Sequence, residues 1–255
     1  ENESFQVIET IENPSLWSID HPYLYTATLS IEGQEETIRF GVRQVELSTE
    51  QGLLLNGEKT ILYGACIHSD NGLLGAETYP DVERRKIEML KKAGYNSIRS
   101  AHNPIVKSFL DAADELGLLV MDEYVDCWFF HKTKYDYASY AMEEYKQDLL
   151  DIVDKDFSHP SVILYSTGNE VAETAFKKGI DFTKTMTDYL HELDDSRPVT
   201  CGINVFFNGI AHTPVAQYSE GKAEKQDQAN KKEMQKKPKK AKREGSSDIF
   251  NDLAT

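Results

Sequence analysis

Polar side chains follow four apolar runs in the middle of the chain, each at the point where the run ends. These polar stretches are His68–Asn71, Arg99–Asn103, Asp122–Glu123 and Thr167–Glu170. One polar run end is ordinary, but four in succession indicate a shared site. If the apolar runs are parallel strands of a barrel, their carboxyl ends meet on one face, where barrel enzymes build their active sites. The pattern therefore predicts one catalytic site made from strand ends.

The sharpest of these signals is the apolar run Val162–Ser166 with the polar residues after it. A short buried strand there would present Glu170 at its end. Gly168 would allow close approach of the backbone, and the Asn169 amide could bond a substrate hydroxyl. A carboxylic acid in this position could protonate a leaving oxygen atom. The competing interpretation is that Glu170 only caps the following helix or pairs with Arg99, and spacing alone does not decide between the two.

Short apolar runs alternate with helical stretches from about residue 53 to residue 203, a texture typical of a parallel sheet with crossover helices. The predicted strands are 60–67, 97–99, 118–121, 162–166 and 199–203. The predicted helices are 81–93, 104–116, about 140–156 and about 174–193. Pro80 and Pro104 suit helix starts, and Gly94 and Gly117 suit helix ends.

This alternation predicts the fold class α/β, with about the first five units of a TIM (β/α)8 barrel. A complete barrel takes about 250 residues, so roughly 85 more would be needed. Only about 52 residues follow position 203. Among them, Lys222–Arg243 carries ten basic and three acidic residues and almost no large apolar ones. Such a composition cannot bury itself, so we expect a solvated insertion there.

The first 48 residues have a different texture, with β-rich runs at 5–8, 23–31 and 37–45. In Tyr25–Ile31 bulky and small polar residues alternate, which is typical of a half-buried antiparallel strand. Three such strands cannot form a stable sandwich alone, so we interpret them as the last strands of a β-sandwich that begins upstream. The predicted domains are therefore 1–48 from the sandwich, 49–205 from the barrel and 206–255 as a charged, flexible insertion.

Charge and cysteine content exclude several classes of function. Twenty-eight basic and 43 acidic side chains give a net charge of −15, which repels phosphate backbones and anionic membranes, so we expect neither nucleic acid nor membrane as a partner. Cys66, Cys127 and Cys201 are far apart and odd in number. They predict neither a disulfide framework nor a zinc site, and we expect them to be buried. The chain lacks an initiating Met, which suggests a segment of a longer protein.

Several blocks of the sequence, in order, resemble glycoside hydrolase family 2, the group of β-galactosidases and β-glucuronidases. The barrel blocks are Gly64–Gly72, Ile98–Pro104, Leu119–Glu123 and Tyr165–Glu170. Upstream, Leu16–Tyr25 and Phe40–Arg43 resemble the end of that family's immunoglobulin-like domain. A lone Asn-Glu pair would be weak evidence, but the similarity runs in the right order from about residue 14 to residue 205.

The resemblance implies a retaining β-glycosidase with Glu170 as its general acid/base and Asn169 binding the sugar 2-hydroxyl. In such enzymes the acid protonates the glycosidic oxygen while a second carboxylate, about 5–5.5 Å away, attacks the anomeric carbon. Water then hydrolyses the covalent glycosyl-enzyme, with the first carboxylate acting as base.

Four further residues are candidates for substrate binding. By resemblance, Asp70 and His102 lie near the sugar hydroxyls, and Arg99 is a residue of the barrel mouth that could hold a carboxylate by a two-pronged bond. Trp128 follows the third predicted strand. It could form a stacking wall for a sugar face or be a buried aromatic residue, and both interpretations stay open.

The chain departs from the family pattern in one important respect. The family's nucleophilic glutamate follows its seventh strand, and only five strands are predicted here. The later glutamates receive no such role; they are Glu220, Glu224, Glu233 and Glu244. Without a second carboxylate a covalent intermediate cannot form, so we expect the isolated chain to be inactive. The segment after Glu123 also lacks the acidic and histidine residues with which some galactosidases hold magnesium, so no metal or other cofactor is expected.

The sequence thus predicts a fragment of a β-glycosidase, with a β-galactoside or a related oligosaccharide as its substrate. A β-glucuronidase of the same family is the first alternative. A carbohydrate-binding relic without catalysis is the second, and another barrel enzyme with acids at its strand ends is the third. Association of the longer protein into a homo-oligomer stays open.

Overall fold

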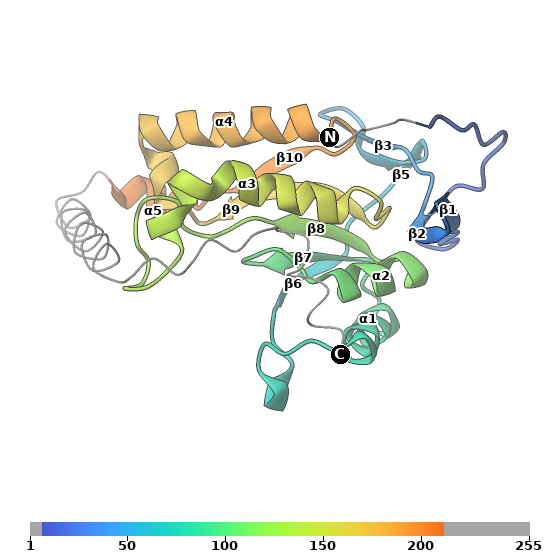
Figure 1. The fold of residues 1–255 in the computed structure, drawn as a ribbon. Helices are drawn as coiled ribbons and strands as arrows, with labels where there is room; N and C mark the ends of the chain where they lie inside the picture. Colours follow the sequence, from blue (N-terminus) through green and yellow to red (C-terminus); the bar gives the residue numbers. More distant parts are fainter. Residues whose placement is uncertain (1–6, 212–255) are drawn as a thin grey trace.

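The computed structural model describes residues 7–211, and a parallel five-stranded sheet forms its centre (Figure 1). Its strands are β6 (Gly64–His68), β7 (Ser97–Ala101), β8 (Leu119–Glu123), β9 (Val162–Asn169) and β10 (Val199–Gly202). Each strand pairs in parallel with its neighbour in the sequence. A doubly wound sheet reverses its strand order at a switch point, whereas a barrel does not. The unbroken order confirms the predicted partial barrel.

Four helices connect these strands and lie beside the sheet in chain order (Figure 1). They are α1 (Pro80–Lys92), α2 (Lys107–Leu116), α3 (Ala138–Asp156) and α4 (Lys177–Leu193), with 3-10 turns at Gly72–Leu74 and Ala172–Ala175. The main core lies between helices and strands. Phe109, Leu149 and Phe182 from the helices pack in one cluster with Ile98 and Val120 from the strands, and all five are buried. Burial of this apolar surface is the main force that holds the helices on the sheet.

Helix ends follow the expected signals with one exception. Gly117 ends α2 in the left-handed region with φ +71. A Cβ at Gly117 would come within 2.2 Å of the carbonyl oxygen of Ile19, so only glycine fits. α2 begins at Lys107 instead of Pro104. The Ile105 N–H donates to the Asp122 carboxylate at 2.9 Å, which ties residue 105 to β8 and accounts for the later helix start.

The N-terminal part forms two small antiparallel sheets. β1 (Tyr25–Ile31) and β2 (Gln34–Phe40) form a hairpin, and β3 (Val45–Ser48), β4 (Gly52–Leu55) and β5 (Glu58–Lys59) form a three-stranded sheet. Trp17 is fully buried, and its indole N–H donates to the carbonyl of Asp114 at 2.8 Å. Trp17 packs with Leu55 and Leu119 in a second core cluster. These contacts join the N-terminal segment to the sheet.

Several element predictions differ from the structure. Val7 and Ile8 lie outside any strand, and the rest of the predicted strand 5–8 lies outside the described residues. The predicted strand 60–67 begins only at Gly64, because the Asn96 side chain takes the hydrogen bonds of Ile61 and Tyr63. Sequence patterning missed β3 to β5 and the seven-residue helix α5 (Val205–Ala211). The domain boundaries stay predictions.

No helix in the described residues 7–211 has both the length and the apolar composition needed to cross a membrane.

Candidate active site at the carboxyl ends of the strands

Three neighbouring strands bring Arg99, Glu123 and Asn169 together at one end of the sheet. Arg99 in β7 donates through Nε to the Glu123 carboxylate in β8 at 2.7 Å. Its Nη2 donates to the side-chain oxygen of Asn169 in β9 at 2.8 Å. Three of the four polar strand ends singled out in the sequence therefore lie side by side in the structure.

Glu123 is the centre of this cluster, although the sequence analysis named only its strand end and gave the residue no role of its own. Its side chain is fully buried. Besides Arg99, His102 Nδ1 contacts Oε1 at 2.7 Å, and the Ser166 hydroxyl donates to Oε2 at 2.7 Å. The Ser100 hydroxyl oxygen accepts a hydrogen bond from the Glu123 N–H at 2.7 Å. A buried carboxylate is costly unless it is paired and hydrogen-bonded, and these partners meet that requirement.

Glu170 follows β9 directly and is exposed at the strand end. It adopts a left-handed backbone conformation with φ +49, which is uncommon for a residue other than glycine and clusters at functional sites. The Glu170 N–H donates to the carbonyl of Gly202 in β10 at 2.6 Å, and Asn204 Nδ2 donates to Oε1 at 2.9 Å. Main chain and side chain are therefore both held in place.

Within the described residues, the Glu170 side chain neither caps a helix nor contacts Arg99, so neither alternative interpretation is supported. Val171 stands at the N-cap of the next helical turn, and no side chain caps it. The guanidinium of Arg99 bonds to Glu123 and Asn169, with a longer contact to Cys66 Sγ. Glu170 remains a strand-end carboxylate.

Asn169 is held from two directions. Its side-chain oxygen accepts from Arg99, and its main-chain oxygen accepts from Lys132 Nζ at 2.8 Å. Lys132 belongs to the loop after β8 and also contacts Asp126 at 3.2 Å. With Oδ1 occupied, the Nδ2 amide is the part of Asn169 left to donate to a ligand.

His102 directly follows β7, and Asp70 follows the neighbouring strand β6. The ring of His102 meets that of His68 edge to face at 5.3 Å, and the peptide bond between Ala101 and His102 is cis. Asp70 lies in the exposed loop after β6, where its carboxylate accepts from the N–H of Gly72 at 2.8 Å. In the part of the chain that the structure describes, residues 7–211, no hydrogen bond or ion pair joins Asp70 to Arg99, Glu123 or Asn169.

The structure decides between the two interpretations of Trp128 and differs from the prediction for Cys66. The Trp128 ring is fully buried, its N–H donates to the Thr167 carbonyl at 3.0 Å, and it packs edge-on against Phe182. The structure therefore supports the buried alternative for Trp128 and corrects its assignment as a sugar-stacking residue. Cys66 is exposed, which corrects the expectation of burial, whereas Cys127 is buried and burial raises the pKa of its thiol to about 12.

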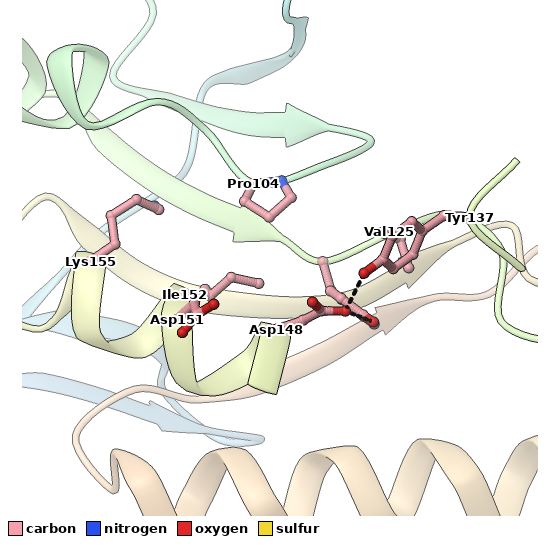
Figure 2. Close-up of a pocket in the computed structure, with 8 residues that line it drawn as sticks. Pro104, Val125, Tyr137, Asp148, Asp151, Ile152 and Lys155 are labelled. Atoms are coloured by element: carbon pink, nitrogen blue, oxygen red, sulfur yellow. Dashed lines mark hydrogen bonds between the residues drawn. The ribbon is translucent and has the colours of Figure 1, made fainter. Parts of the chain in front are cut away.

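A separate cavity of about 300 Å³ lies between α3 and the segments that follow β7 and β8 (Figure 2). The hydroxyls of Tyr124 and Tyr137 both donate to one oxygen of Asp148, at 2.6 and 2.9 Å. Burial and the neighbouring Asp148 raise the pKa of both phenols. None of the residues predicted for the site lines this cavity, so the strand-end cluster remains the candidate active site.

The sequence contained weak signals for the residues that it missed. Glu123 stands in one of the four polar strand ends, but the sequence alone does not show that Arg99 and His102 both contact it. Ser166 and Asn204 look like ordinary polar residues until β8 and β10 are placed beside β9. Within residues 7–211, no group of three or more His, Cys, Asp or Glu side chains could hold a metal ion.

Comparisons with known proteins agree with this geometry. Residues 45–245 match the model of the glycosyl hydrolases family 2 TIM barrel domain, and residues 1–43 match a second family 2 model. A β-galactosidase of Bacteroides ovatus is 36% identical over 231 residues, covering 76% of this chain and 27% of the relative. The chain therefore spans about a quarter of that relative's length.

Solved structures give the same result. A family 2 member from Bacteroides cellulosilyticus has a TM-score of 0.72 and 45% identity, and the match covers 75% of this chain and 25% of that one. A β-glucuronidase of Faecalibacterium prausnitzii has a TM-score of 0.70 and 30% identity, covering 79% and 35%. The parallel strand order and the strand-end glutamate agree with these matches. Because the family model covers most of the chain, the chain belongs to glycosyl hydrolase family 2.

Proposed function

We propose that this chain supplies the acid/base half of the active site of a retaining β-glycosidase, with Glu170 as the general acid/base. The observation that supports it is the placement of Glu170 at the carboxyl end of the buried strand β9, beside an Asn169 that Arg99 holds in place. Glu170 protonates the glycosidic oxygen in the first step and deprotonates water in the second. Asn169 donates to the sugar 2-hydroxyl, and Asp70 and His102 bind other hydroxyls.

The nucleophile belongs to a part of the barrel beyond the five described strands. Retention requires a second carboxylate about 5–5.5 Å from the first. The later glutamates that the sequence left unassigned, such as Glu220, lie outside the described residues. We therefore expect the 255-residue chain alone to show no turnover. Hydrolysis of a nitrophenyl β-galactoside by this purified chain, abolished by Glu170→Gln, would contradict that expectation.

A β-galactoside is the favoured substrate and a β-glucuronide the second candidate. The relatives and neighbours bear both names, a β-galactosidase of B. ovatus and a β-glucuronidase of F. prausnitzii. The kcat/KM of the full-length protein for the two nitrophenyl glycosides, measured side by side, decides between them. Saturable sugar binding without any turnover would favour a carbohydrate-binding relic instead.

The acid role of Glu170 has its own test in the full-length protein. Glu170→Gln keeps the shape of the side chain but cannot donate a proton to the leaving oxygen. We expect kcat/KM, which reports the glycosylation step, to fall by about 10²–10⁴-fold for an alkyl glycoside, whose leaving group needs protonation. A dinitrophenyl glycoside, whose leaving group departs as an anion, should lose far less in the glycosylation step. Equal losses of kcat/KM for both substrates would contradict an acid role.

A further inference from the structure

Glu123 is a fully buried carboxylate that the mechanism above does not use. It lies at the end of β8, between the strand that carries Arg99 and the strand that carries Asn169. Its two oxygens contact Arg99, His102 and Ser166, each at 2.7 Å. Two of these partners, Arg99 and His102, are also candidates for the substrate site.

The contact with Arg99 sets the direction in which the Asn169 amide points. Arg99 Nη2 contacts Glu123 Oε2 at 2.5 Å and donates to Asn169 Oδ1 at 2.8 Å. The guanidinium is planar and rigid, so the carboxylate that fixes one edge of it also fixes the position of Nη2. Because Nη2 is a donor, it holds the Asn169 oxygen. The Nδ2 group is then the edge of the Asn169 amide that can donate to a bound sugar.

The contact with His102 sets the tautomer of that imidazole. A carboxylate accepts hydrogen bonds, so Nδ1 of His102 must carry the hydrogen when it lies 2.7 Å from Glu123 Oε1. In the neutral ring Nε2 is then an acceptor. One buried carboxylate therefore determines an amide donor and an imidazole acceptor at the same strand ends.

We propose that Glu123 is a positioning residue that presents Asn169 as a hydrogen-bond donor and His102 as an acceptor to the hydroxyls of the bound sugar. This inference rests on the proposed glycosidase function. Glu123 touches neither the sugar nor the reacting atoms and acts through Arg99 and His102. Hydrogen bonds to the sugar 2-hydroxyl strengthen in the transition state. Loss of the Glu123 charge should therefore lower kcat more than it raises KM.

The test compares two substrates in the full-length protein: the nitrophenyl β-glycoside that the protein hydrolyses best and its 2-deoxy analogue. Glu123→Gln removes the charge and places an amide donor against Arg99 or His102. We expect kcat for the parent substrate to fall at least tenfold more than kcat for the 2-deoxy substrate, which has no hydroxyl for Asn169 to bind. Glu123→Asp, which keeps the charge, should restore part of the difference.

Glu173→Gln is the matched control. Glu173 is also a buried carboxylate, but it accepts the backbone N–H groups of Trp128, Phe129 and Phe130 at 2.9–3.0 Å and does not contact Arg99. Any effect of this variant should reduce the rates of both substrates by the same factor. If Glu123→Gln fails to fold, Arg99→Lys serves in its place, because it loses the same rigid link to Asn169.

The outcomes separate the two proposals. An equal loss for the parent and 2-deoxy substrates in Glu123→Gln, or in Arg99→Lys where that replaces it, overturns the positioning role. A wild-type protein that hydrolyses neither the β-galactoside nor the β-glucuronide counts against the proposed function itself.

Discussion

Glu170 occupies a backbone conformation that most residues avoid. Its φ of +49 costs a residue with a Cβ about 1–2 kcal/mol relative to the right-handed region. The hydrogen bonds to Gly202 and Asn204 hold the residue there. Strain of this kind is tolerated where it places a functional group, and here it sets the direction of the carboxylate at the strand end.

That strain predicts the order of stability of two variants. Glu170→Gly and Glu170→Ala both remove the carboxylate and its bond to Asn204, but only glycine relieves the left-handed strain. Glycine also adds freedom to the unfolded chain, which costs about 0.4–1 kcal/mol. We expect the Gly variant to exceed the Ala variant by about 0.5 kcal/mol in the free energy of unfolding, measured in urea. A more stable Ala variant would show that the conformation is not strained.

At the scale of the elements, α3 is tied to the segments after β8 through Asp148 (Figure 2). Tyr124 is almost fully buried, and the Asp148 carboxylate accepts hydrogen bonds from the hydroxyls of both Tyr124 and Tyr137. Asp148→Ala leaves these donors unpaired, so we expect a loss of about 1–3 kcal/mol in the free energy of unfolding. Asp151→Ala, an exposed carboxylate in the same helix, is the control and should change it by less than about 0.5 kcal/mol.

A second tie between α3 and β8 is sensitive to pH. Lys155 Nζ bonds to Asp122 at 2.9 Å and also to Asp156. Burial, and then the nearby Asp122, raises the pKa of Asp156 well above its usual value. At pH values between the unfolded-state and the folded-state pKa, Asp156 therefore keeps a proton in the folded protein that it releases on unfolding. The Asp156 contribution to stability must fall as pH rises from about 4 through the folded-state pKa.

Asp156→Asn removes this titration. We expect the stability of the wild type relative to Asp156→Asn to decrease as pH rises from about 4 to 8, in urea unfolding at each pH. A difference that stays constant or grows over this range would mean that Asp156 is ionised in the folded protein at all these pH values.

For the whole molecule, much of the architecture could be predicted from the sequence because its signals are local. Apolar runs of four to eight residues, Gly117 after α2 and polar residues at four strand ends are visible in one dimension. They were enough to predict a partial barrel with Glu170 at a strand end. The family resemblance then supplied the chemistry that spacing alone left undecided.

The remaining features depend on register and packing, which no single sequence segment contains. Arg99 pairs with Met121 across β7 and β8. Glu123 lies two residues further on, so it shares the face of Arg99. Its role as the common acceptor therefore appears only with the register. Trp128 follows the same strand, but its ring lies in the core. There its indole N–H donates to the Thr167 carbonyl, and the ring packs against Phe182.

The most direct test of the acid/base role uses azide and the full-length protein with Glu170→Ala. A dinitrophenyl β-galactoside still forms the glycosyl-enzyme, because its leaving group needs no proton, but water cannot attack without the base. Azide is small and needs no deprotonation, so it should fill the space of the missing carboxylate and raise kcat, with β-galactosyl azide as the product. No increase in rate with azide, or an azide product of α configuration, would contradict Glu170 as the acid/base of a retaining enzyme.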